Sequence, residues 1–429
     1  MRYLIIGTGP AGIAAAEKIR GLDEENEILM LTSEEIAGYS KPLITYFLGR
    51  KVNEDRMFYR PPWYFEERNI SVMTSTKVIE VNPAKKLVIT ESGEAINYDR
   101  LLIATGGLPI VPEIEGLNPS EMEGVFTFTQ WKDSKDVAKY ITDNDVTEAV
   151  VLGGGLIGLK TTEALLELGL KVSIVELSDR ILSNTFDKKA SMIVTSALQK
   201  RGCNVYTNDT IVQVKGKKKI TKVVLKSGRE IKTKLLIIAI GVKPNVGFLK
   251  ESGVRVNRGV VVNEHMETNI TDIFAAGDCA EFYDPRLGKS STIAIWPVAF
   301  SEGEVAGYNM AGERVSYQGG IPMNSVEIAG VATISVGNTS AEVENVEILE
   351  YESDKRSVYK KLVIKDGKLV GAVFVGDIDR AGIYTGLILQ KVDVSSFKDD
   401  LMRDDFGLVY LPKEYRKKLM EGELKVWLE

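Results

Sequence analysis

The chain has 429 residues, a formal net charge of −6 and a sequence pI near 5.4, which excludes a generally basic protein that binds nucleic acid or anionic membranes by charge alone. Its length suggests about three domains, and its 44% hydrophobic and 27% charged residues indicate a globular chain. Two cysteines and one histidine, Cys203, Cys279 and His265, are too few for an iron–sulfur cluster or a structural zinc site, so we expect no metal site.

The first predicted strand, Tyr3–Ile6, runs directly into the glycine turn Gly7–Gly12, which reads G-x-G-x-x-G, and then into a helix from Pro10 to about Arg20. In such a turn the first glycine permits a tight bend. The second lets the backbone approach a pyrophosphate, and the third lets the helix pack closely on the sheet. The helix amino terminus offers N–H groups and a partial positive charge to phosphates. The turn therefore predicts a dinucleotide site.

The chain begins only a few residues before this first glycine, and no run approaches the ~20 apolar residues of a membrane helix. We therefore expect a cytoplasmic protein that is neither exported nor integral to a membrane.

The next predicted elements complete a first nucleotide-binding unit. The strand Glu27–Leu31 is followed by Glu34, the acidic residue that we expect to bind the adenosine ribose. Helix-like segments reach about Asn69, and a buried strand, Leu101–Ile103, stops before Gly106.

A second unit repeats this order. The strand Ala149–Leu152 leads into the glycine turn Gly153–Gly158 and a helix to about Gly169, and the strand Lys171–Val175 ends in Glu176. A carboxylate at this position binds a ribose hydroxyl and repels a 2′-phosphate. At ~4 Å and an effective dielectric of ~20, that repulsion costs up to ~4 kcal/mol. Glu176 therefore predicts a preference for NADH over NADPH, although Arg180 or Lys171 would soften it, and a solvated strand-end glutamate is the alternative interpretation.

The later part of the chain contains a third signature and a different kind of domain. The run Thr271–Ala280 ends a buried strand at Gly277 and Asp278, a geometry that suits an aspartate on a ribityl hydroxyl and backbone N–H groups on a phosphate. From about Gly320 the pattern changes to alternating strands, Val331–Val336, Tyr359–Ile364 and Leu369–Val375, followed by a helix-like tail. This pattern predicts a small antiparallel α+β domain.

Taken together, these motifs resemble the FAD-dependent pyridine nucleotide-disulfide oxidoreductase superfamily. The two Ala-x-Gly-x-x-Pro turns, Ala104–Pro109 and Ala239–Pro244, match its signatures in order. The segments Tyr39–Leu43, Trp296-Pro297 and Tyr317–Gly319 are similar to the branch that holds NADH:rubredoxin reductases, flavin portions of nitrite reductases and NADH oxidases.

The resemblance implies an α/β fold with two Rossmann-like, three-layer dinucleotide-binding domains and a C-terminal α+β interface domain. The FAD-binding domain would be discontinuous, 1–115 and 243–319, with an NAD(H)-binding domain inserted at 116–242. The interface or dimerisation domain would span 320–429 and include the helical tail.

The motifs and the resemblance also give the expected cofactor-binding residues. Those expected to bind FAD are Gly7, Gly9, Pro10, Ala11, Gly12, Glu34, Lys41, Pro42, Val78, Ala104, Thr105, Gly106, Gly277, Asp278 and Trp296. Those expected to bind NAD(H) are Gly153, Gly155, Leu156, Ile157, Gly158, Glu176 and Gly241.

Two departures from the family pattern change the expected chemistry. Pro42 occupies the position of the redox cysteine that the oxidases of this branch carry before the flavin, so cysteine-based peroxide or disulfide chemistry is not expected. Relatives usually carry a glutamate at position 160, next to a flavin-proximal lysine, which here would be Lys41. With Lys160 in its place, we expect two cations, without an intervening acid, to raise the flavin potential by roughly 40 mV. The alternative is that Lys160 points to solvent.

We therefore expect an FAD-dependent NADH oxidoreductase that passes hydride from NADH to FAD and electrons on to an external acceptor. The acceptor would be a rubredoxin- or ferredoxin-like protein or a metal-containing partner subunit, and the chain would be a homodimer or a subunit of a larger redox complex. One alternative is a peroxide-forming NADH oxidase. Another is a flavin-binding sensor or interaction protein with little turnover.

Overall fold

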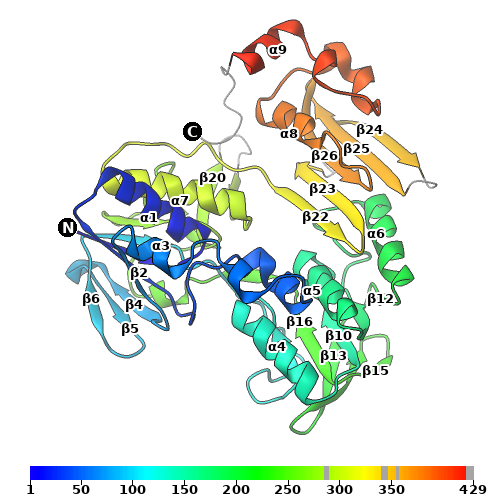
Figure 1. Cartoon of the computed structure of the whole chain (residues 1–429), viewed down its shortest axis with the longest axis horizontal. Coiled ribbons are helices and arrows are strands. Elements are labelled where there is room, and N and C mark those ends of the chain that lie inside the picture. The colour runs from blue at the N-terminus through cyan, green and yellow to red at the C-terminus, as the bar shows by residue number, and fades with distance from the viewer. Residues whose placement is uncertain (285–288, 340–345, 354–356, 422–429) are drawn as a thin grey trace. The chain divides into compact units, whose positions relative to one another are not determined.

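The computed structural model describes residues 1–284, 289–339, 346–353 and 357–421, drawn as a ribbon in Figure 1. The chain divides into two compact units. Unit 1 comprises Met1–Pro112, Thr127–Lys139 and Ile240–Gly320, and unit 2 comprises Glu113–Phe126, Tyr140–Ala239 and Ile321–Glu429. Each unit is therefore assembled from segments that are far apart in the sequence.

Unit 1 is built around a five-stranded sheet of order β19-β7-β1-β2-β3, in which every neighbouring pair is parallel. The strands are β1 (Arg2–Ile6), β2 (Glu27–Leu31), β3 (Ile70–Met73), β7 (Arg100–Ile103) and β19 (Ile273–Ala275). Its central strands are continuous apolar runs because both faces of the sheet are covered. Ile6 pairs with Leu31 on one side and Ile103 on the other, so three strands end together beside the first glycine turn.

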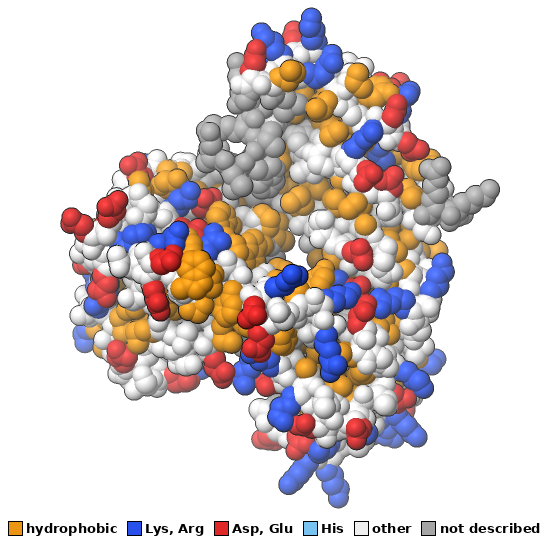
Figure 2. All heavy atoms as spheres, viewed as in Figure 1, with side chains coloured by type: hydrophobic (Ala, Val, Ile, Leu, Met, Phe, Trp, Pro, Cys, Tyr) orange, Lys and Arg blue, Asp and Glu red, His pale blue; other side chains and the backbone are white. Residues whose placement is uncertain are grey.

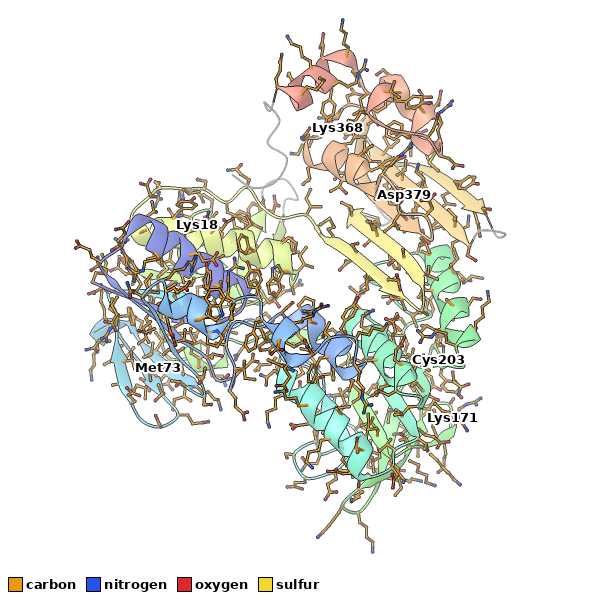
Figure 3. The ribbon with its side chains drawn as sticks, viewed as in Figure 1. Lys18, Met73, Lys171, Cys203, Lys368 and Asp379 are labelled. Atoms are coloured by element: carbon orange, nitrogen blue, oxygen red, sulfur yellow. The ribbon has the colours of Figure 1, made fainter. Side chains whose placement is uncertain are left out.

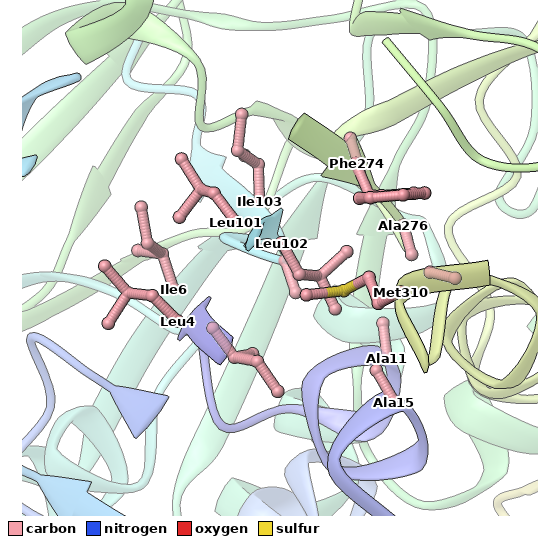
Figure 4. Close-up of a cluster of buried hydrophobic side chains, with 14 of the residues drawn as sticks. Leu4, Ile6, Ala11, Ala15, Leu101, Leu102, Ile103, Phe274, Ala276 and Met310 are labelled. Carbon is pink, nitrogen blue, oxygen red and sulfur yellow. The ribbon is translucent and has the colours of Figure 1, made fainter. Parts of the chain in front are cut away.

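Two helices pack against each other on this sheet (Figure 1): α1 (Pro10–Leu22) and α7 (Trp296–Ala311). Two glycines of α7 allow their backbones to touch. A Cβ at Gly303 would lie 2.2 Å from the carbonyl oxygen of Ala11, and one at Gly307 would lie 2.7 Å from that of Ala15. The apolar core beside these helices contains the residues labelled in Figure 4: Leu4, Ile6, Ala11, Ala15, Leu101, Leu102, Ile103, Phe274, Ala276 and Met310.

Smaller elements complete unit 1. Two short helices, α2 (Ile44–Leu48) and α3 (Pro62–Glu66), lie between β2 and β3 in the sequence. The antiparallel sheet β4-β5-β6 is formed by Val78–Asn82, Leu87–Thr90 and Ala95–Asn97. The remaining strands are the pair β8 (Gly107–Pro109) and β17 (Val242–Pro244), and the group β18 (Val260–Val262), β20 (Ala280–Asp284) and β21 (Lys289–Ser291).

Unit 2 contains a second sheet of the same kind, of order β12-β11-β10-β16-β9. Its strands are β9 (Val125–Thr127), β10 (Glu148–Leu152), β11 (Lys171–Val175), β12 (Asn204–Tyr206) and β16 (Leu235–Ile238). Helices α5 (Leu156–Glu167) and α6 (Lys188–Lys200) lie between its strands in the sequence, while most of α4 (Trp131–Asp143), which precedes β10, belongs to unit 1. A three-stranded antiparallel sheet is formed by β13 (Ile211–Gly216), β14 (Ile220–Leu225) and β15 (Glu230–Lys232).

The C-terminal part of unit 2 is an antiparallel sheet of order β22-β23-β26-β25-β24. Its strands are β22 (Met323–Ile328), β23 (Val331–Gly337), β24 (Val346–Ser353), β25 (Val358–Lys365) and β26 (Lys368–Val375), followed by helices α8 (Ala381–Leu389) and α9 (Lys413–Met420). The start of α6 contacts this sheet through polar groups. The Tyr359 hydroxyl donates to Asp187 at 2.8 Å, and the Lys189 ammonium lies 2.8 Å from a Glu350 carboxylate oxygen.

The predicted fold class is confirmed: the chain has two parallel α/β sheets and a C-terminal antiparallel α+β region. The predicted strand Glu27–Leu31 is found with the same bounds, and the predicted helix from Pro10 extends to Leu22. The proposed domain boundaries at 115, 242 and 319 remain predictions.

Candidate active site

The first glycine turn has the geometry that its sequence predicts. Gly7 has φ +123°, and a Cβ there would lie 2.0 Å from the carbonyl oxygen of Ala104. A Cβ on Gly12 would lie 2.0 Å from the carbonyl oxygen of Gly7. These two glycines are therefore required by the backbone itself, which passes between β1, β7 and α1.

Gly9 has a different role. It is the N-cap of α1 and has no side-chain cap, and a Cβ placed on it would meet nothing within 4 Å. The first N–H groups of a helix have no partner within the helix, so α1 presents donors beside an open space. Such an end suits a phosphate, because the N–H groups and the helix dipole both favour negative charge.

The second glycine turn repeats the main features of the first. Gly153 has φ +114°, and a Cβ on Gly158 would lie 2.0 Å from the carbonyl oxygen of Gly153. The N-cap of α5, Gly155, has no side-chain cap and faces open space. In both units the N–H of the first glycine donates to the last residue of the neighbouring strand at 2.8 Å: Gly7 to Leu31 and Gly153 to Val175.

The acidic residue after β11 lies on its own glycine turn. Glu176 accepts the N–H of Gly154 at 2.6 Å through one carboxylate oxygen and the N–H of Ser178 at 2.7 Å through the other. The carboxylate is thus held beside the turn, at the position that the sequence predicts for a ribose acceptor. Lys171 begins β11 (Figure 3) while Glu176 follows its other end, so Lys171 does not soften the charge of Glu176. Arg180 pairs with Asp179 at 2.7 Å instead.

The corresponding acid of unit 1 is engaged differently. Glu34 accepts a short hydrogen bond from the Tyr39 hydroxyl and lies 3.0 Å from the Lys41 ammonium. The Tyr39 hydroxyl also accepts the N–H of Trp131 at 3.2 Å. Burial, followed by the charge of Glu34, raises the pKa of Tyr39 far above its usual range, so this hydroxyl remains a donor to the carboxylate. Glu34 and Lys41, both predicted to face FAD, therefore form one polar cluster with Tyr39.

The third signature lies where β19 ends. Gly277 has φ +81° and Asp278 follows it. Burial raises the pKa of Asp278, and the Lys41 ammonium acts in the opposite direction. The Gly277 N–H donates to Glu302 of α7 at 2.8 Å. Burial, with an added contribution from the charge of Asp278, raises the pKa of Glu302 to about 8, although the Gly277 N–H and Tyr317 lower it.

The other predicted FAD residues also lie in unit 1. Trp296 begins α7 and is half-buried, with its ring 5.1 Å from that of Tyr59 at 82°. The Thr105 hydroxyl donates to the carbonyl of Asn245 at 2.7 Å, which joins the two Ala-x-Gly turns. The remaining positions are buried Ala104, half-buried Gly106, buried Val78 at the start of β4, and exposed Pro42 in a short 3-10 helix.

The Lys160 side chain is paired and mostly buried, which the sequence did not predict. Its ammonium donates to Glu163 in a short hydrogen bond and to the carbonyl of Glu327 at 3.0 Å, and its side chain is 13% exposed. Since Lys41 pairs with Glu34, each lysine has a carboxylate partner within its own unit. Lys160 does not point to solvent, and the expectation that Lys41 and Lys160 together tune the flavin remains a prediction. Residues 160 and 163 share a helix face, which is the physical reason for the pairing.

The remaining predicted NAD residues divide between the units. Leu156 and Ile157 form the first turn of α5 in unit 2. Gly241 has φ +118°, belongs to unit 1 and accepts the N–H of Ile110 at 3.0 Å.

Neither thiol is suited to redox exchange. Cys279 lies in unit 1 and Cys203 in unit 2, just before β12 (Figure 3), and both are buried. Burial raises the pKa of Cys279 to about 11 and that of Cys203 to about 12, so neither is a thiolate at neutral pH. Among the described residues no group of three or more His, Cys, Asp or Glu side chains could hold a metal ion.

The surface charge is mixed. On the face shown in Figure 2, Lys and Arg side chains are interspersed with Asp and Glu. Within the described ranges no helix is long and apolar enough to cross a membrane.

Sequence reasoning missed Glu302, Tyr39 and Tyr59. Their partners, Gly277, Trp131 and Trp296, are 25, 92 and 237 residues away, so no local pattern links them. The Gly303 and Gly307 pair was a usable signal, because small residues four apart on a helix indicate close contact with another backbone.

Comparison with known proteins agrees with this geometry. The model of the family described as pyridine nucleotide-disulphide oxidoreductase matches residues 1–303, and that of the rubredoxin NAD+ reductase C-terminal domain matches residues 322–392. The chain is similar to an NADH oxidase of Methanocaldococcus jannaschii, with 32% identity over 88% of each chain. It is also similar to an NADH-rubredoxin oxidoreductase of Clostridium acetobutylicum, with 30% identity over 88% of this chain and 91% of the relative. The solved structure titled NADH:rubredoxin oxidoreductase from C. acetobutylicum superposes with a TM-score of 0.75, 28% identity and coverage of 92% of this chain and 96% of that chain.

Proposed function

The chain belongs to the pyridine nucleotide-disulphide oxidoreductase family, and we propose that it is an NADH-driven flavoenzyme that delivers electrons to a separate small redox protein or to a metal-containing partner subunit. The observation that carries this proposal is the pair of matching glycine turns, each ending in an uncapped helix with open space beside its N-cap glycine. FAD and NAD(P)H are the cofactors of this family, and two such ends are what two dinucleotides require.

Unit 1 carries the residues that fit FAD. The Gly7–Gly12 turn and the amino terminus of α1 would bind the pyrophosphate, and the Gly277–Asp278 turn would hold the ribityl chain and second phosphate. Glu34 would bind the adenosine ribose from the cluster that it forms with Tyr39 and Lys41. When bound, FAD supplies a ring that takes up hydride and releases electrons to an acceptor.

Unit 2 carries the residues that fit NADH. The Gly153–Gly158 turn and the amino terminus of α5 would bind its pyrophosphate, and Glu176 would accept hydrogen bonds from the adenosine ribose hydroxyls. The two N–H donors from Gly154 and Ser178 fix the carboxylate in position. A 2′-phosphate would meet this negative charge, which supports a preference for NADH.

The chemistry of the chain supports an external acceptor. A disulfide relay would require two neighbouring thiols, of which at least one is readily ionised. Here the two cysteines are buried, lie in different units and have raised pKa values. The match to the rubredoxin NAD+ reductase C-terminal domain supports a protein acceptor.

Anaerobic reduction followed by acceptor assays tests this proposal. Purified protein that contains FAD should lose its flavin absorbance when NADH is added without oxygen, and should then reduce rubredoxin or ferredoxin catalytically. Protein that binds no FAD on reconstitution would overturn the assignment of unit 1. Protein that binds FAD but is not reduced by NADH would support the sensor or interaction protein.

A peroxide-forming NADH oxidase is the second candidate function, and the similarity to an archaeal NADH oxidase favours it. Assay in air separates the two. Rapid stoichiometric formation of hydrogen peroxide supports the oxidase, while slow turnover in air that a redox protein accelerates supports the reductase.

A further inference from the structure

A buried carboxyl group lies directly behind the third signature. Glu302 is 6% exposed on α7, and its Oε2 accepts the N–H of Gly277 at 2.8 Å. Gly277 and Asp278 form the turn that the proposed function assigns to FAD. Glu302 therefore supports a cofactor-binding turn from the side of the protein core.

The hydrogen-bond donors to Glu302, the Gly277 N–H and the Tyr317 hydroxyl, carry no positive charge. Among the described residues no Lys, Arg or His is recorded as its ion-pair partner, whereas buried Glu163 of unit 2 pairs with both Lys160 and Arg201. Glu281, another buried carboxyl group of unit 1, accepts two backbone N–H groups, from Arg258 and Gly259. An ionised carboxylate that is buried with one backbone N–H donor and no cation partner is costly.

The ionisable groups that bear on Glu302 are few. Asp278, on the turn, adds a negative charge, while the Tyr317 hydroxyl and the Gly277 N–H favour the ionised form. Helix α1 presents the backbone of Ala11 and Ala15 to the adjoining Gly303 and Gly307. Its Lys18 also adjoins Gly307, and the Lys18 ammonium pairs with Glu304 at 2.9 Å. Lys41 acts on Asp278 and is paired with Glu34. Burial is the largest of these effects, and it raises the pKa of Glu302 to about 8.

We propose that Glu302 is a positioning residue that holds the Gly277–Asp278 turn for FAD as a neutral carboxylic acid, and that its ionisation weakens FAD binding. The inference rests on the proposed FAD site in unit 1. The neutral carbonyl oxygen accepts the Gly277 N–H without adding charge to the site. The ionised form would place a second carboxylate beside Asp278, in a site that must also accept the negative pyrophosphate.

FAD affinity measured against pH tests the proposal. Apoprotein is titrated with FAD between pH 6 and 9.5, and binding is followed by the change in flavin fluorescence. We expect the affinity to fall about tenfold or more as pH rises through about 8, since a like charge enters a low-dielectric site. Glu302→Gln keeps the shape and the acceptor for Gly277 but cannot ionise, so its affinity should be independent of pH in this range.

Two further variants make the test specific. Glu281→Gln alters a buried carboxyl group of the same unit and should keep the wild-type fall in affinity. Asp278→Asn removes the neighbouring charge and should move the midpoint of the fall to lower pH. Either a pH-independent wild type or a Glu302→Gln protein with the wild-type fall would overturn the inference. Failure to bind FAD at any pH would instead overturn the proposed FAD site.

An infrared titration tests the protonation state without relying on the variant's stability. The apoprotein should show the absorption of a protonated carboxylic acid at pH 7 that disappears near pH 8, and Glu302→Gln should lack that band. If Glu302→Gln does not fold, the wild-type spectrum still decides, because the absence of a protonated acid at pH 7 contradicts the inference.

Discussion

The two glycine turns differ less in their backbones than in the side chains around them. Both have a first glycine at positive φ, a third glycine whose Cβ would lie 2.0 Å from the first glycine's carbonyl oxygen, and an uncapped helix. However, Glu176 binds the N–H of its own turn, whereas Glu34 is bound to Tyr39 and Lys41. Unit 1 also has Glu302, which accepts the N–H of Gly277 in the Gly277–Asp278 turn.

This difference indicates which part of a dinucleotide site is general. The strand, glycine turn and helix end supply a phosphate site wherever they occur, because their donors belong to the backbone. Discrimination between nucleotides comes from the acid and its partners, which each unit has arranged in its own way. Variants made in matched pairs, one in each unit, can therefore separate the two roles.

The largest expected effect comes from alanine variants that block one glycine turn at a time. Gly158→Ala places a methyl group 2.0 Å from the Gly153 carbonyl oxygen and must displace the turn. We expect FAD to remain bound, and reduction by NADH to slow by about 100-fold or more, since misplacement by an ångström can cost that much. Anaerobic stopped-flow reduction measures the rate, and chemical reduction of the flavin by dithionite should be unaffected.

The matched variant is Gly12→Ala, which makes the equivalent clash with Gly7 in unit 1. It should yield protein without FAD that still binds NADH. If Gly158→Ala lost FAD or Gly12→Ala lost only NADH binding, the assignment of the two turns would be reversed.

The next prediction concerns the pH dependence of the free energy of unfolding, to which the buried Glu302 of unit 1 contributes. The pKa of Glu302 is raised from 4.5 to about 8 by burial, so the folded apoprotein holds one more proton than the unfolded chain between these values. Its free energy of unfolding should therefore decrease as pH rises from 4.5 to about 8 and level off above, by about 1.4 kcal/mol for each pKa unit. Denaturant unfolding at several pH values gives the free energy of unfolding of the wild type and of Glu302→Gln. Equal pH profiles for the two proteins would contradict the prediction.

A smaller effect is expected at the acid of unit 2. Glu176→Ala removes the ribose acceptor and the charge that opposes a 2′-phosphate, so the ratio of kcat/KM for NADH to that for NADPH should fall by about 10- to 100-fold, less than the unscreened ~4 kcal/mol allows. Steady-state kinetics with both nucleotides provide the measurement. Glu34→Ala, its counterpart in unit 1, should lower FAD retention and leave the ratio unchanged.

The smallest expected effect is at Lys160. Because Glu163 neutralises it, Lys160→Met should shift the flavin midpoint potential by less than the roughly 40 mV expected of one uncompensated charge. A spectroelectrochemical titration measures the shift, and a change of 40 mV or more would restore Lys160 as a flavin-tuning residue. Denaturant unfolding of the same variant reports the cost of removing the Lys160–Glu163 pair.

Local patterns predicted the fold and the glycine turns because the requirements for them are local. Gly7, Gly12 and Gly158 are fixed by close contacts of the backbone within one strand–turn–helix segment and its neighbours, and Gly153 by its positive φ. The two parallel sheets and the antiparallel C-terminal sheet follow from runs of apolar residues and turn signals of the same range.

Side-chain partners from distant segments were not predictable in this way. Glu302 meets Gly277 across 25 residues of one segment of unit 1, and Tyr39 meets Trp131 because the chain returns to unit 1 at Thr127. Lys160 is the exception: Glu163 lies three positions further along one helix, and the pairing was readable from that spacing.

The glycine contacts between α1 and α7 have a consequence for biosynthesis. Helix α1 emerges from the ribosome early, but β19 and α7, against which its sheet and backbone pack, follow β7 by about 170 residues. At the usual speed of translation this is a delay of roughly 10–30 s. The nascent amino-terminal segment must therefore wait, with its apolar surface unmatched, while the intervening segment is made. Chaperone protection during this interval would serve the parallel sheet of unit 1 more than that of unit 2, whose strands have all been made by Ile238.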